Sequence, residues 1–463
     1  MCGLTLAGLL AFSGPALAST DTAAVPLSAL SVLPFALLLV CIAVVPLVAA
    51  HWWHSHVNKA LVAMLFAVPV AAYLLYLGEE TQGASIRALA HELQQYISFI
   101  VLLAALYTIS GGIVVTGDIR ATPMVNTLFL AAGAVLANLI GTTGASMLLI
   151  RPLLQTNSER RNTRHTPVFF IFVVSNLGGV LTPLGDPPLF LGFLNGVDFD
   201  WTLRLWPQWL TANGLVLAVF FVWDSLAFHR EKERDLLLDR VLMTPLRLRG
   251  KINLLFLVGV LLAVVLQSPR LAHALRSYLP EWHYCPDLTL TWPWAELIMV
   301  VMAILSWFLT PRSLREANAF TWSAIIEVAV LFLGIFVTMV PALEVLKQNG
   351  HSMHLTEPWQ YFWLTGALSS FLDNAPTYMT FATLAAGQGD FRQLMHDAPL
   401  LLAAVSCGAV FMGANTYIGN GPNFMVKAIA EERGYSMPSF FGYMLYSGAI
   451  LLPIFFIITI VFF

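Results

Sequence analysis

Charged side chains are scarce in this 463-residue chain, where Asp, Glu, Lys and Arg together make up only 11% of the residues. Soluble domains carry about a quarter charged residues, so this composition excludes an ordinary soluble protein. The deficit extends along the whole chain, and apolar runs of about 18 to 25 residues recur, each long enough to cross a ~30 Å hydrocarbon core as a helix. With a mean hydropathy of +0.77, the sequence predicts a polytopic membrane protein.

Cysteines are few, and the common catalytic motifs are missing. Cys2, Cys41, Cys285 and Cys407 are scattered without metal or redox spacing, so we expect no disulfide framework. The sequence contains no Walker A loop, no GxSxG elbow, no CxxC pair and no HExxH helix. It therefore gives no indication of catalysis, of a cofactor, or of a nucleotide or nucleic-acid partner. A membrane enzyme or a receptor-like scaffold would need a catalytic cluster or a sensor domain, which the sequence does not supply.

The apolar runs predict ten crossings, two of them broken by polar and helix-breaking residues. The crossings are expected at 29–50, 58–77, 97–117, 166–195 (broken), 206–228, 252–267, 294–310, 322–346, 398–426 (broken) and 437–463. Residues 1–18 end in Ala16-Leu-Ala18 and are typical of a cleaved signal peptide, apart from the missing basic residues. A short uncleaved anchor is the alternative.

The polar interruptions in the two halves of the chain resemble each other. The first set is Leu136-Ala-Asn138-Leu-Ile-Gly-Thr142-Thr-Gly144 followed by Ser175-Asn-Leu-Gly-Gly-Val-Leu-Thr182-Pro-Leu-Gly-Asp186-Pro-Pro188. The second is Leu372-Asp-Asn374-Ala-Pro-Thr377 followed by Asn415-Thr-Tyr-Ile-Gly-Asn420-Gly-Pro-Asn423. Gly112-Ile-Val-Val-Thr116 and Gly334-Ile-Phe-Val-Thr338 precede them in the same order. Hydrophobic segments interrupted at corresponding positions of two halves indicate the binding site of a transporter.

The basic residues indicate re-entrant hairpins at 124–154 and 359–386, turning near Asn138 and Asn374. A full crossing at 124–154 would place the arginines that follow it outside. With both hairpins, 17 of the 23 basic residues lie on the cytoplasmic side, as the positive-inside rule requires. These residues are Lys59, Arg120, Arg151, Arg160, Arg161, Arg164, Arg230, Lys232, Arg234, Arg240, Arg247, Arg249, Lys251, Arg312, Arg315, Lys427 and Arg433.

This orientation makes the two halves inverted repeats, because the 97–117 helix runs inward and its counterpart at 322–346 runs outward. We therefore expect an all-α polytopic membrane protein with its N-terminus on the outer side. Its parts are scaffold helices at 29–95, a first inverted repeat at 96–228, a charged linker at 229–251 that forms a solvated cytoplasmic helix, scaffold helices at 252–321, and a second inverted repeat at 322–463.

Two carboxylates, those of Asp186 and Asp373, lie in the interruptions. A charge inside the membrane is costly, so we interpret both as functional residues. A desolvated carboxylate can bind a proton near physiological pH, so Na⁺ and H⁺ can compete for it. The alternative is that each Asp caps a half-helix. Neutral side-chain oxygens nearby could complete a cation site, or could only hold loose backbone in place. They belong to Asn138, Thr142, Thr143, Ser175, Asn176, Thr182, Asn374, Thr377, Asn415, Thr416, Asn420 and Asn423.

Unwinding frees carbonyl oxygens, which suit a cation, and exposes half-helix N-termini, which suit an anion. The breaks alone therefore do not show which kind of ion is bound. Glu327, in the 322–346 helix, is interpreted either as a proton relay or as an interfacial residue. We expect Asp224, Glu296 and Lys427, near the ends of spans, to snorkel toward water. His51, His54 and His56 flank Trp52 and Trp53, which is typical of an aromatic belt more than of a metal site or a pH sensor.

At the two break motifs the chain resembles the ion transporter superfamily, in particular the branch of NhaD-type sodium/proton antiporters and arsenite permeases, which is citrate transporter-like. The resemblance covers residues 30–463 and also includes Glu327-Val-Ala-Val-Leu-Phe-Leu-Gly-Ile-Phe. It implies a homodimer in the lipid bilayer, a scaffold for dimerisation, and a mobile region of hairpins and broken helices that moves like an elevator.

The favoured hypothesis is a secondary active sodium/proton antiporter of a bacterial inner membrane that expels Na⁺ or Li⁺. Asp186 and Asp373 would bind cation and proton in turn, and the Asn, Ser and Thr oxygens would complete the site. The alternative is a Na⁺- or H⁺-coupled transporter of an anion such as citrate, a dicarboxylate or arsenite. Relatives that carry citrate or dicarboxylates present Ser-Asn-Thr at both hairpin tips, whereas this chain keeps only Asn138 and Asn374.

Overall fold

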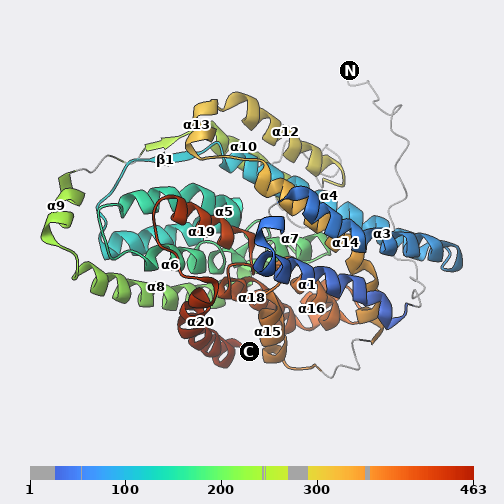
Figure 1. The fold of residues 1–463 in the computed structure, drawn as a ribbon. Helices are drawn as coiled ribbons and strands as arrows, with labels where there is room; N and C mark the ends of the chain where they lie inside the picture. The colour runs from blue at the N-terminus through green and yellow to red at the C-terminus, as the bar shows by residue number, and fades with distance from the viewer. Residues whose placement is uncertain (1–26, 54, 242–244, 246, 269–289, 350–354) are drawn as a thin grey trace, which may run out of the picture.

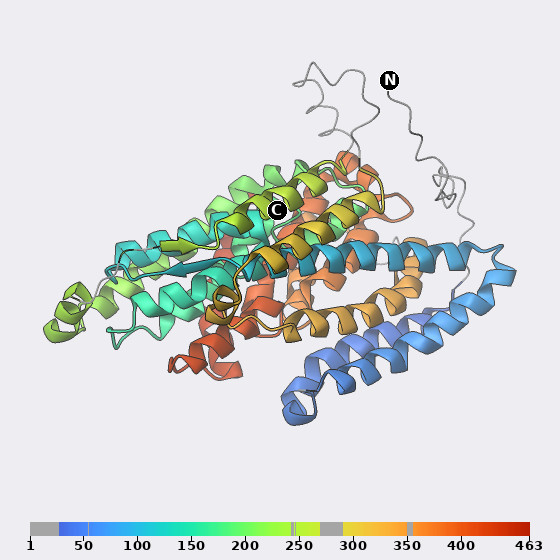
Figure 2. The same ribbon diagram turned by 90° about the horizontal axis from the view of Figure 1, so that it is seen from above.

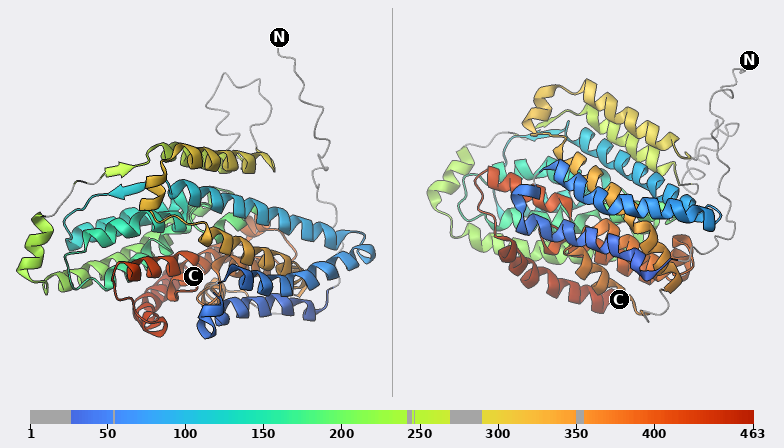
Figure 3. Two further views of the ribbon diagram at one scale, coloured as in Figure 1. Left: turned by 45° about the horizontal axis from the view of Figure 1, so that its top comes forward. Right: turned by 45° about the vertical axis from the view of Figure 1, so that its right-hand side comes forward.

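The computed structural model describes residues 27–53, 55–241, 245, 247–268, 290–349 and 355–463. The expected signal peptide, Cys2, His54 and Cys285 lie outside these residues. Most of the helices run along a common direction, whereas α9 and α15 run across it (Figure 1). The turn between α3 and α4 lies at one end of the molecule, and α9 protrudes at the other end in every view (Figures 1 and 3).

Among the described residues, four helical segments precede the first half. They are η1 (Ala29–Val32), α1 (Leu33–Val48), α2 (Ala50–Trp53) and α3 (His56–Glu80). The first half contains α4 (Ala84–Ser110), α5 (Pro123–Thr156), α6 (His165–Val173), η2 (Leu177–Leu181), α7 (Pro187–Leu194), η3 (Trp201–Leu205) and α8 (Trp206–Phe228).

A middle region connects this half to the second. It contains α9 (Glu233–Val241), α10 (Ile252–Val265), α12 (Trp294–Leu309) and α13 (Arg312–Ala317). The second half contains α14 (Ser323–Asn349), α15 (Pro358–Ser369), α16 (Asn374–Ala386), α17 (Phe391–Asp397), α18 (Pro399–Met412), η6 (Gly413–Asn415), α19 (Gly421–Glu432) and α20 (Phe440–Phe462). Each half thus follows the same order of a long helix, a hairpin, a broken helix and a final helix.

Helix α5 is folded back on itself. A straight helix of its 34 residues would be about 50 Å long. Yet Asn126, near its start, and Asn157, at its end, exchange two side-chain hydrogen bonds of 2.9 Å. The reversal is at Gly141, whose φ of 76° suits glycine and where a Cβ would lie 3.2 Å from the Leu184 carbonyl oxygen. The expected hairpin is present, and its turn lies three residues beyond Asn138.

Six helices among the described residues are long and apolar enough to cross a membrane, or seven if the bent pair α17 and α18 counts as one. Four shorter apolar helices accompany them, including α10 and α12. The chain is therefore a multi-pass membrane protein. The expected number of ten crossings is not reached by this criterion, because the broken and short segments fall below the length of a full span.

Two expectations about secondary structure were wrong. The helix expected at 97–117 ends at Ser110, and Val114–Thr116 forms β1 instead, since a glycine pair is followed by residues that favour strands. The linker expected to be one helix contains α9 and then β2 (Arg247–Arg249), which pairs antiparallel with β1. This small sheet joins the end of α4 to the beginning of α10.

Helices α4 and α14 form the centre of the molecule. They pack against each other, and both pack against α3, while α12 and α10 pack on α4 and on each other. On their other side lie the hairpins and broken helices, which pair across the two halves: α5 packs on α19, and α16 packs on α7. Figure 2 shows α1 and α3 in blue on the side of α14 that faces away from the green and red broken helices. The broken helices are therefore held between elements of both halves.

Candidate functional site

The first break brings unwound backbone into close contact with the first hairpin. Helix α6 ends at Val173, and α7 begins at Pro187, after Asp186 in an extended conformation. A Cβ on Gly178 would lie 2.7 Å from Ala134 Cα in the hairpin, so only glycine permits this approach. The Thr142 amide, just past the turn of the hairpin, donates to the Gly185 carbonyl at 2.8 Å. The hairpin tip is thus fixed against the residue that precedes Asp186.

Asp186 is the centre of the site. It is 1% exposed, and its two carboxylate oxygens accept hydrogen bonds from three elements. Thr142 Oγ1 donates to Oδ1 at 2.8 Å, and Asn420 Nδ2 donates to the same oxygen at 3.2 Å. Asn374 Nδ2 donates to Oδ2. The carboxylate therefore joins the first hairpin, the second hairpin and the second broken helix.

A network of buried amides continues from Asp186 between the two breaks. Asn420 Nδ2 also lies 3.1 Å from the Ser175 carbonyl and 3.2 Å from Asn176 Oδ1. Asn176 Nδ2 donates to Asn423 Oδ1 at 2.7 Å, and Asn423 Nδ2 donates to the carbonyls of Gly413 and Thr416. The two unwound segments therefore contact each other directly through the side chains of Asn176, Asn420 and Asn423.

Other predicted residues support the backbone around this network. Asn138 Oδ1 accepts from the Leu181 amide, and Thr182 Oγ1 donates to the Asn138 carbonyl. In the second half, Asn415 Nδ2 donates to Ser370 Oγ, and Thr416 Oγ1 donates to the Ser370 carbonyl. These side chains hold the tips and breaks in place.

Ser175 and Thr377 also bond within the protein, to Ser146 Oγ and to the Asp373 carbonyl. Asp373 itself is a helix cap, since its Oδ1 accepts from the Ala375 amide at the start of α16. Asp373 is nevertheless close enough to Asp186 to interact with it electrostatically. The geometry thus gives the two carboxylates different surroundings.

A cavity of about 70 Å³ lies beside Asp186. Its polar lining comes from Thr142, Thr143, Asp186 and Tyr107, and its apolar lining comes from α4, α14, the hairpin turn and the first break with α7. The predicted residue Thr143 therefore faces this cavity. Under the positive-inside orientation, the lining residues of α4 and α14 belong to the cytoplasmic halves of these helices.

The half-helix N-termini at the site have few free donors. Pro187 and Pro188 begin α7, Pro376 is in the first turn of α16, and Pro422 is in the first turn of α19. Proline has no backbone N–H. The Ala375 amide is already bonded to Asp373. These termini are therefore poorly suited to bind an anion through their backbone amides.

Oxygens without a partner lie in the same region. The Oδ1 atoms of Asn374 and Asn415 are buried and accept no hydrogen bond from the described residues. A buried amide oxygen without a donor is costly, and a cation would satisfy it. The structure shows no group of three or more His, Cys, Asp or Glu placed to hold a metal among the residues it describes.

Glu327 does not reach this network. Its carboxylate forms an ion pair of 2.7 Å with Lys59 and remains 38% exposed. Whether Glu327 is a proton relay or an interfacial residue stays a prediction. Lys427 is partly exposed and pairs with Glu431 at 2.8 Å.

The expectation that Asp224 and Glu296 snorkel was wrong, because both are buried. Asp224 accepts from Arg160 at 2.7 and 3.1 Å, from His165 at 3.0 Å and from Asn126 at 3.0 Å. This polar cluster ties both ends of α5 to the beginning of α6 and the end of α8. Sequence reasoning missed it because its members are distant in the chain and individually lie near the ends of spans.

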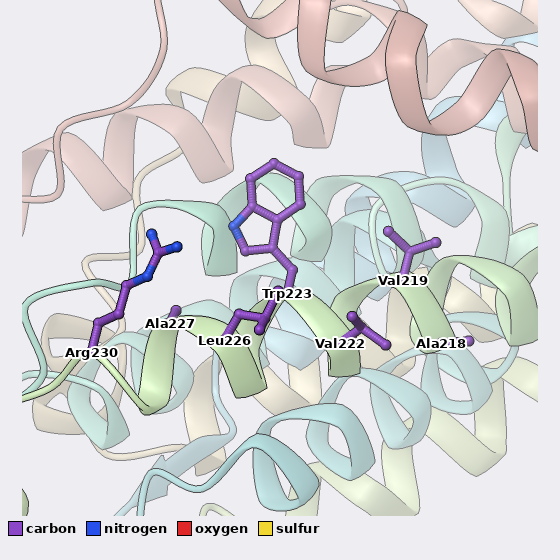
Figure 4. A pocket seen from close by; sticks show the side chains of 7 residues that line it. All are labelled: Ala218, Val219, Val222, Trp223, Leu226, Ala227 and Arg230. Atoms are coloured by element: carbon purple, nitrogen blue, oxygen red, sulfur yellow. The ribbon is translucent and has the colours of Figure 1, made fainter.

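A larger groove of about 580 Å³ runs along α8, away from Asp186. Figure 4 shows its lining from Ala218 to Arg230, with Trp223 and Arg230 projecting to the same side. The lining is apolar apart from Arg230 and the indole nitrogen. It lies on the surface of a membrane-spanning helix and contains none of the predicted site residues.

The model of the family described as "Putative citrate transport" matches residues 24–463. The chain belongs to this family. Among curated proteins, none matches the sequence. Membership agrees with the citrate transporter-like resemblance and with a secondary transporter built around paired breaks, and it does not distinguish the sodium/proton antiporter branch from anion transporters.

Proposed function

We propose that the protein is a secondary active sodium/proton antiporter in which Asp186 binds Na⁺ and H⁺ in turn. The observation that carries the proposal is the environment of this carboxylate. It is buried, and within the described part of the chain its hydrogen bonds come from the neutral side chains of Thr142, Asn374 and Asn420. A buried carboxylate without a basic partner is costly, and a bound cation or proton removes the uncompensated charge.

The same side chains can serve both occupants. Each of the three donors also carries an oxygen, and rotation of an amide or hydroxyl turns that oxygen toward a cation. Asn374 Oδ1, which has no hydrogen-bond partner among the residues that the structure describes, is already available. Oxygen ligands suit a small hard cation such as Na⁺ or Li⁺, and a proton on Asp186 would convert the carboxylate into a neutral group that needs none of them.

Occupancy at Asp186 also changes the contact between the two halves. Because donors from α16 and α19 reach a carboxylate that precedes α7, a bound ion adjusts how the broken helices pack. We propose that the hairpins and broken helices move together past α4 and α14 in an elevator-like step. We further propose that the protein acts as a homodimer in a bacterial inner membrane.

The test is ion exchange by the purified protein in proteoliposomes with a pH-sensitive dye inside. Na⁺ and Li⁺ should each drive proton movement in the opposite direction, and K⁺ should not. We also expect Asp186→Asn to abolish this proton flux while the protein remains folded. Wild-type proteoliposomes that move no protons when Na⁺ is added would refute the proposal.

Sodium-coupled citrate uptake is the second candidate, because the family match favours it. In that case Asp186 would bind the coupling Na⁺, and citrate would bind elsewhere, since the proline-containing N-termini offer few amide donors. Labelled citrate offered to the same proteoliposomes separates the two functions. Uptake that depends on Na⁺ without proton exchange would favour the citrate transporter.

A further inference from the structure

A second buried carboxylate, Glu92, lies on α4 outside the site described above. It is 8% exposed, and its Oε2 has no hydrogen-bond partner among the described residues. Lys347 and Glu344 of α14 are close enough to interact with it electrostatically. These two form an ion pair of 2.9 Å and are 46% and 20% exposed, so Glu92 is adjacent to a solvent-accessible polar surface.

A polar bridge beside Glu92 links α4 to the outer end of α7. Gln95 Nε2 donates to Asn195 Oδ1 at 3.0 Å, and Asn195 Nδ2 donates to Gln95 Oε1 at 2.9 Å. His91 Nε2 lies 2.7 Å from Gln95 Nε2. The titratable and charged groups around Glu92 are therefore His91 from its own helix and Glu344 and Lys347 from α14, while α7 contributes the neutral Asn195.

An apolar layer separates Glu92 from the cavity at Asp186. Phe99 stacks on Phe332 with ring centroids 4.9 Å apart and also contacts Phe336 at 6.0 Å. Phe99 and Phe190 line the cavity beside Asp186. The aromatic rings thus close the cavity on the side that faces Glu92.

The helix α7 sets the distance between the two carboxylates. Asp186 immediately precedes α7, beside the hairpin turn at Gly141, which faces Leu106 of α4. Asn195 immediately follows α7 and bonds to Gln95 of α4. Its eight residues make it about 12 Å long. An outward displacement of α7 by about its own length would therefore bring Asp186 to the level of Gln95 and Glu92.

We propose that Glu92 is a proton-binding site on the outer side of the ion pathway. The proposal rests on the exchange function proposed for Asp186. A proton from the outer solution binds the Glu92 carboxylate through the exposed surface at Glu344 and Lys347. With α7 displaced outward, this proton passes to the Asp186 carboxylate as Na⁺ leaves it for the outer solution. One proton thus replaces one Na⁺ on Asp186, and Glu92 takes up another proton from outside.

The experiment compares Glu92→Gln with Glu296→Gln in proteoliposomes. Glu296 is a matched control, because it is also buried and its Oε2 has no partner in the described part of the chain, but its other oxygen accepts from Ser98 at 2.6 Å between α4 and α12. Glu92→Gln should slow Na⁺-driven proton flux at least about tenfold and abolish its dependence on outer pH. Binding of ²²Na⁺ to the solubilised protein should stay unchanged, and Glu296→Gln should keep the flux and its pH profile.

Glu92→Asp provides a second readout, because it keeps a titratable group. Its flux should persist with a shifted outer-pH profile, and this result supports the proposal even where Glu92→Gln does not fold. Unchanged flux and pH profile in Glu92→Gln would overturn it, and so would an equal loss in both Gln variants. Failure of the exchange function itself is distinguishable, since it would show as absent flux in the wild type.

Discussion

The side chain of Asn374 donates a hydrogen bond to Asp186, although the two residues are 188 positions apart. Asn374 is the first residue of α16, and Asp186 immediately precedes α7. The bond therefore joins the second hairpin to the first broken helix. An event at the carboxylate, such as the arrival of a cation, acts at the same time on both halves of the chain.

The two carboxylates singled out by the sequence should respond differently to removal of their charge. Asp186→Asn removes the carboxylate at the centre of the amide network, so Na⁺-driven proton flux should vanish. Asp373→Asn should keep the flux within a few-fold, because Asn caps a helix about as well as Asp. The measurement is dye-reported proton flux in proteoliposomes. Complete loss in Asp373→Asn with a folded protein would show that both carboxylates carry ions.

The amide donors should set the affinity of the site. A hydrogen bond to a charged group contributes about 1.5–3 kcal/mol, which corresponds to about 10- to 100-fold in binding. Asn374→Ala removes both the donor to Asp186 and the unpartnered oxygen, so half-maximal flux should need at least about tenfold more Na⁺. Asn253→Ala is the control, because Asn253 is equally buried but bonds to Gly112 and Thr310 near α10 and α12. A similar change in Na⁺ dependence in the control would argue against a direct role.

The sequence predicted the positions of most helices from their apolar runs. The final helix of the first repeat was expected at 206–228 and is α8, with these same bounds. The start of α4 was misplaced, because His91, Glu92 and Gln95 interrupt its apolar pattern. These residues are helical owing to packing against α14 and α7, which a local pattern does not reveal. The β1–β2 pairing was missed for a similar reason, since its strands are far apart in the chain.

The site was predictable in composition and not in geometry. The interrupted segments identified Asp186, Asn176, Asn420 and Asn423, because breaks at membrane depth need polar side chains. Nothing in the sequence distinguished Asp186, which three other elements contact, from Asp373, which caps its own helix. That difference depends on which segments meet in space.

The orientation can be tested with single cysteines in a variant without the native ones. Ser158, Leu237 and Thr356 are exposed and suit this labelling. Cysteines at 158 and 237 should react with an impermeant maleimide only in inside-out vesicles, and one at 356 only in right-side-out vesicles. Labelling of position 158 from the outside would contradict the orientation based on the basic residues.

Asp118, in the segment between β1 and α5, should make stability depend on pH. Burial, together with the nearby Glu159, raises the pKa of Asp118 above its usual value. The folded protein therefore binds a proton on Asp118 more tightly than the unfolded chain does. The stability that this bound proton contributes is lost as the pH rises through the pKa of Asp118 in the folded protein. Asp118→Asn should be more stable relative to the wild type at pH 8 than at pH 4. Thermal unfolding in detergent measures this difference, with the exposed Asp397→Asn as control.

The buried pair of Arg160 and Asp224 should be the strongest electrostatic contribution to the cytoplasmic end of the first hairpin. Both side chains are 0% exposed and lie 2.7 Å apart. Arg160→Met leaves Asp224 buried without its cation, which should cost about 3–5 kcal/mol of unfolding free energy. The double variant Arg160→Met, Asp224→Leu removes both charges and should be less destabilised than Arg160→Met alone.

The neighbouring Arg161 offers a matched control for this cluster. Its side chain is 65% exposed and pairs with Asp235 at 2.9 Å, so Arg161→Met should cost about 1 kcal/mol or less. Chemical unfolding in detergent compares the three variants. If Arg160 and Arg161 contributed equally, the cluster would not be the element that holds the ends of α5 together. If the double variant were less stable than Arg160→Met, Asp224 would stabilise the fold even without the arginine, through its hydrogen bonds with His165 and Asn126.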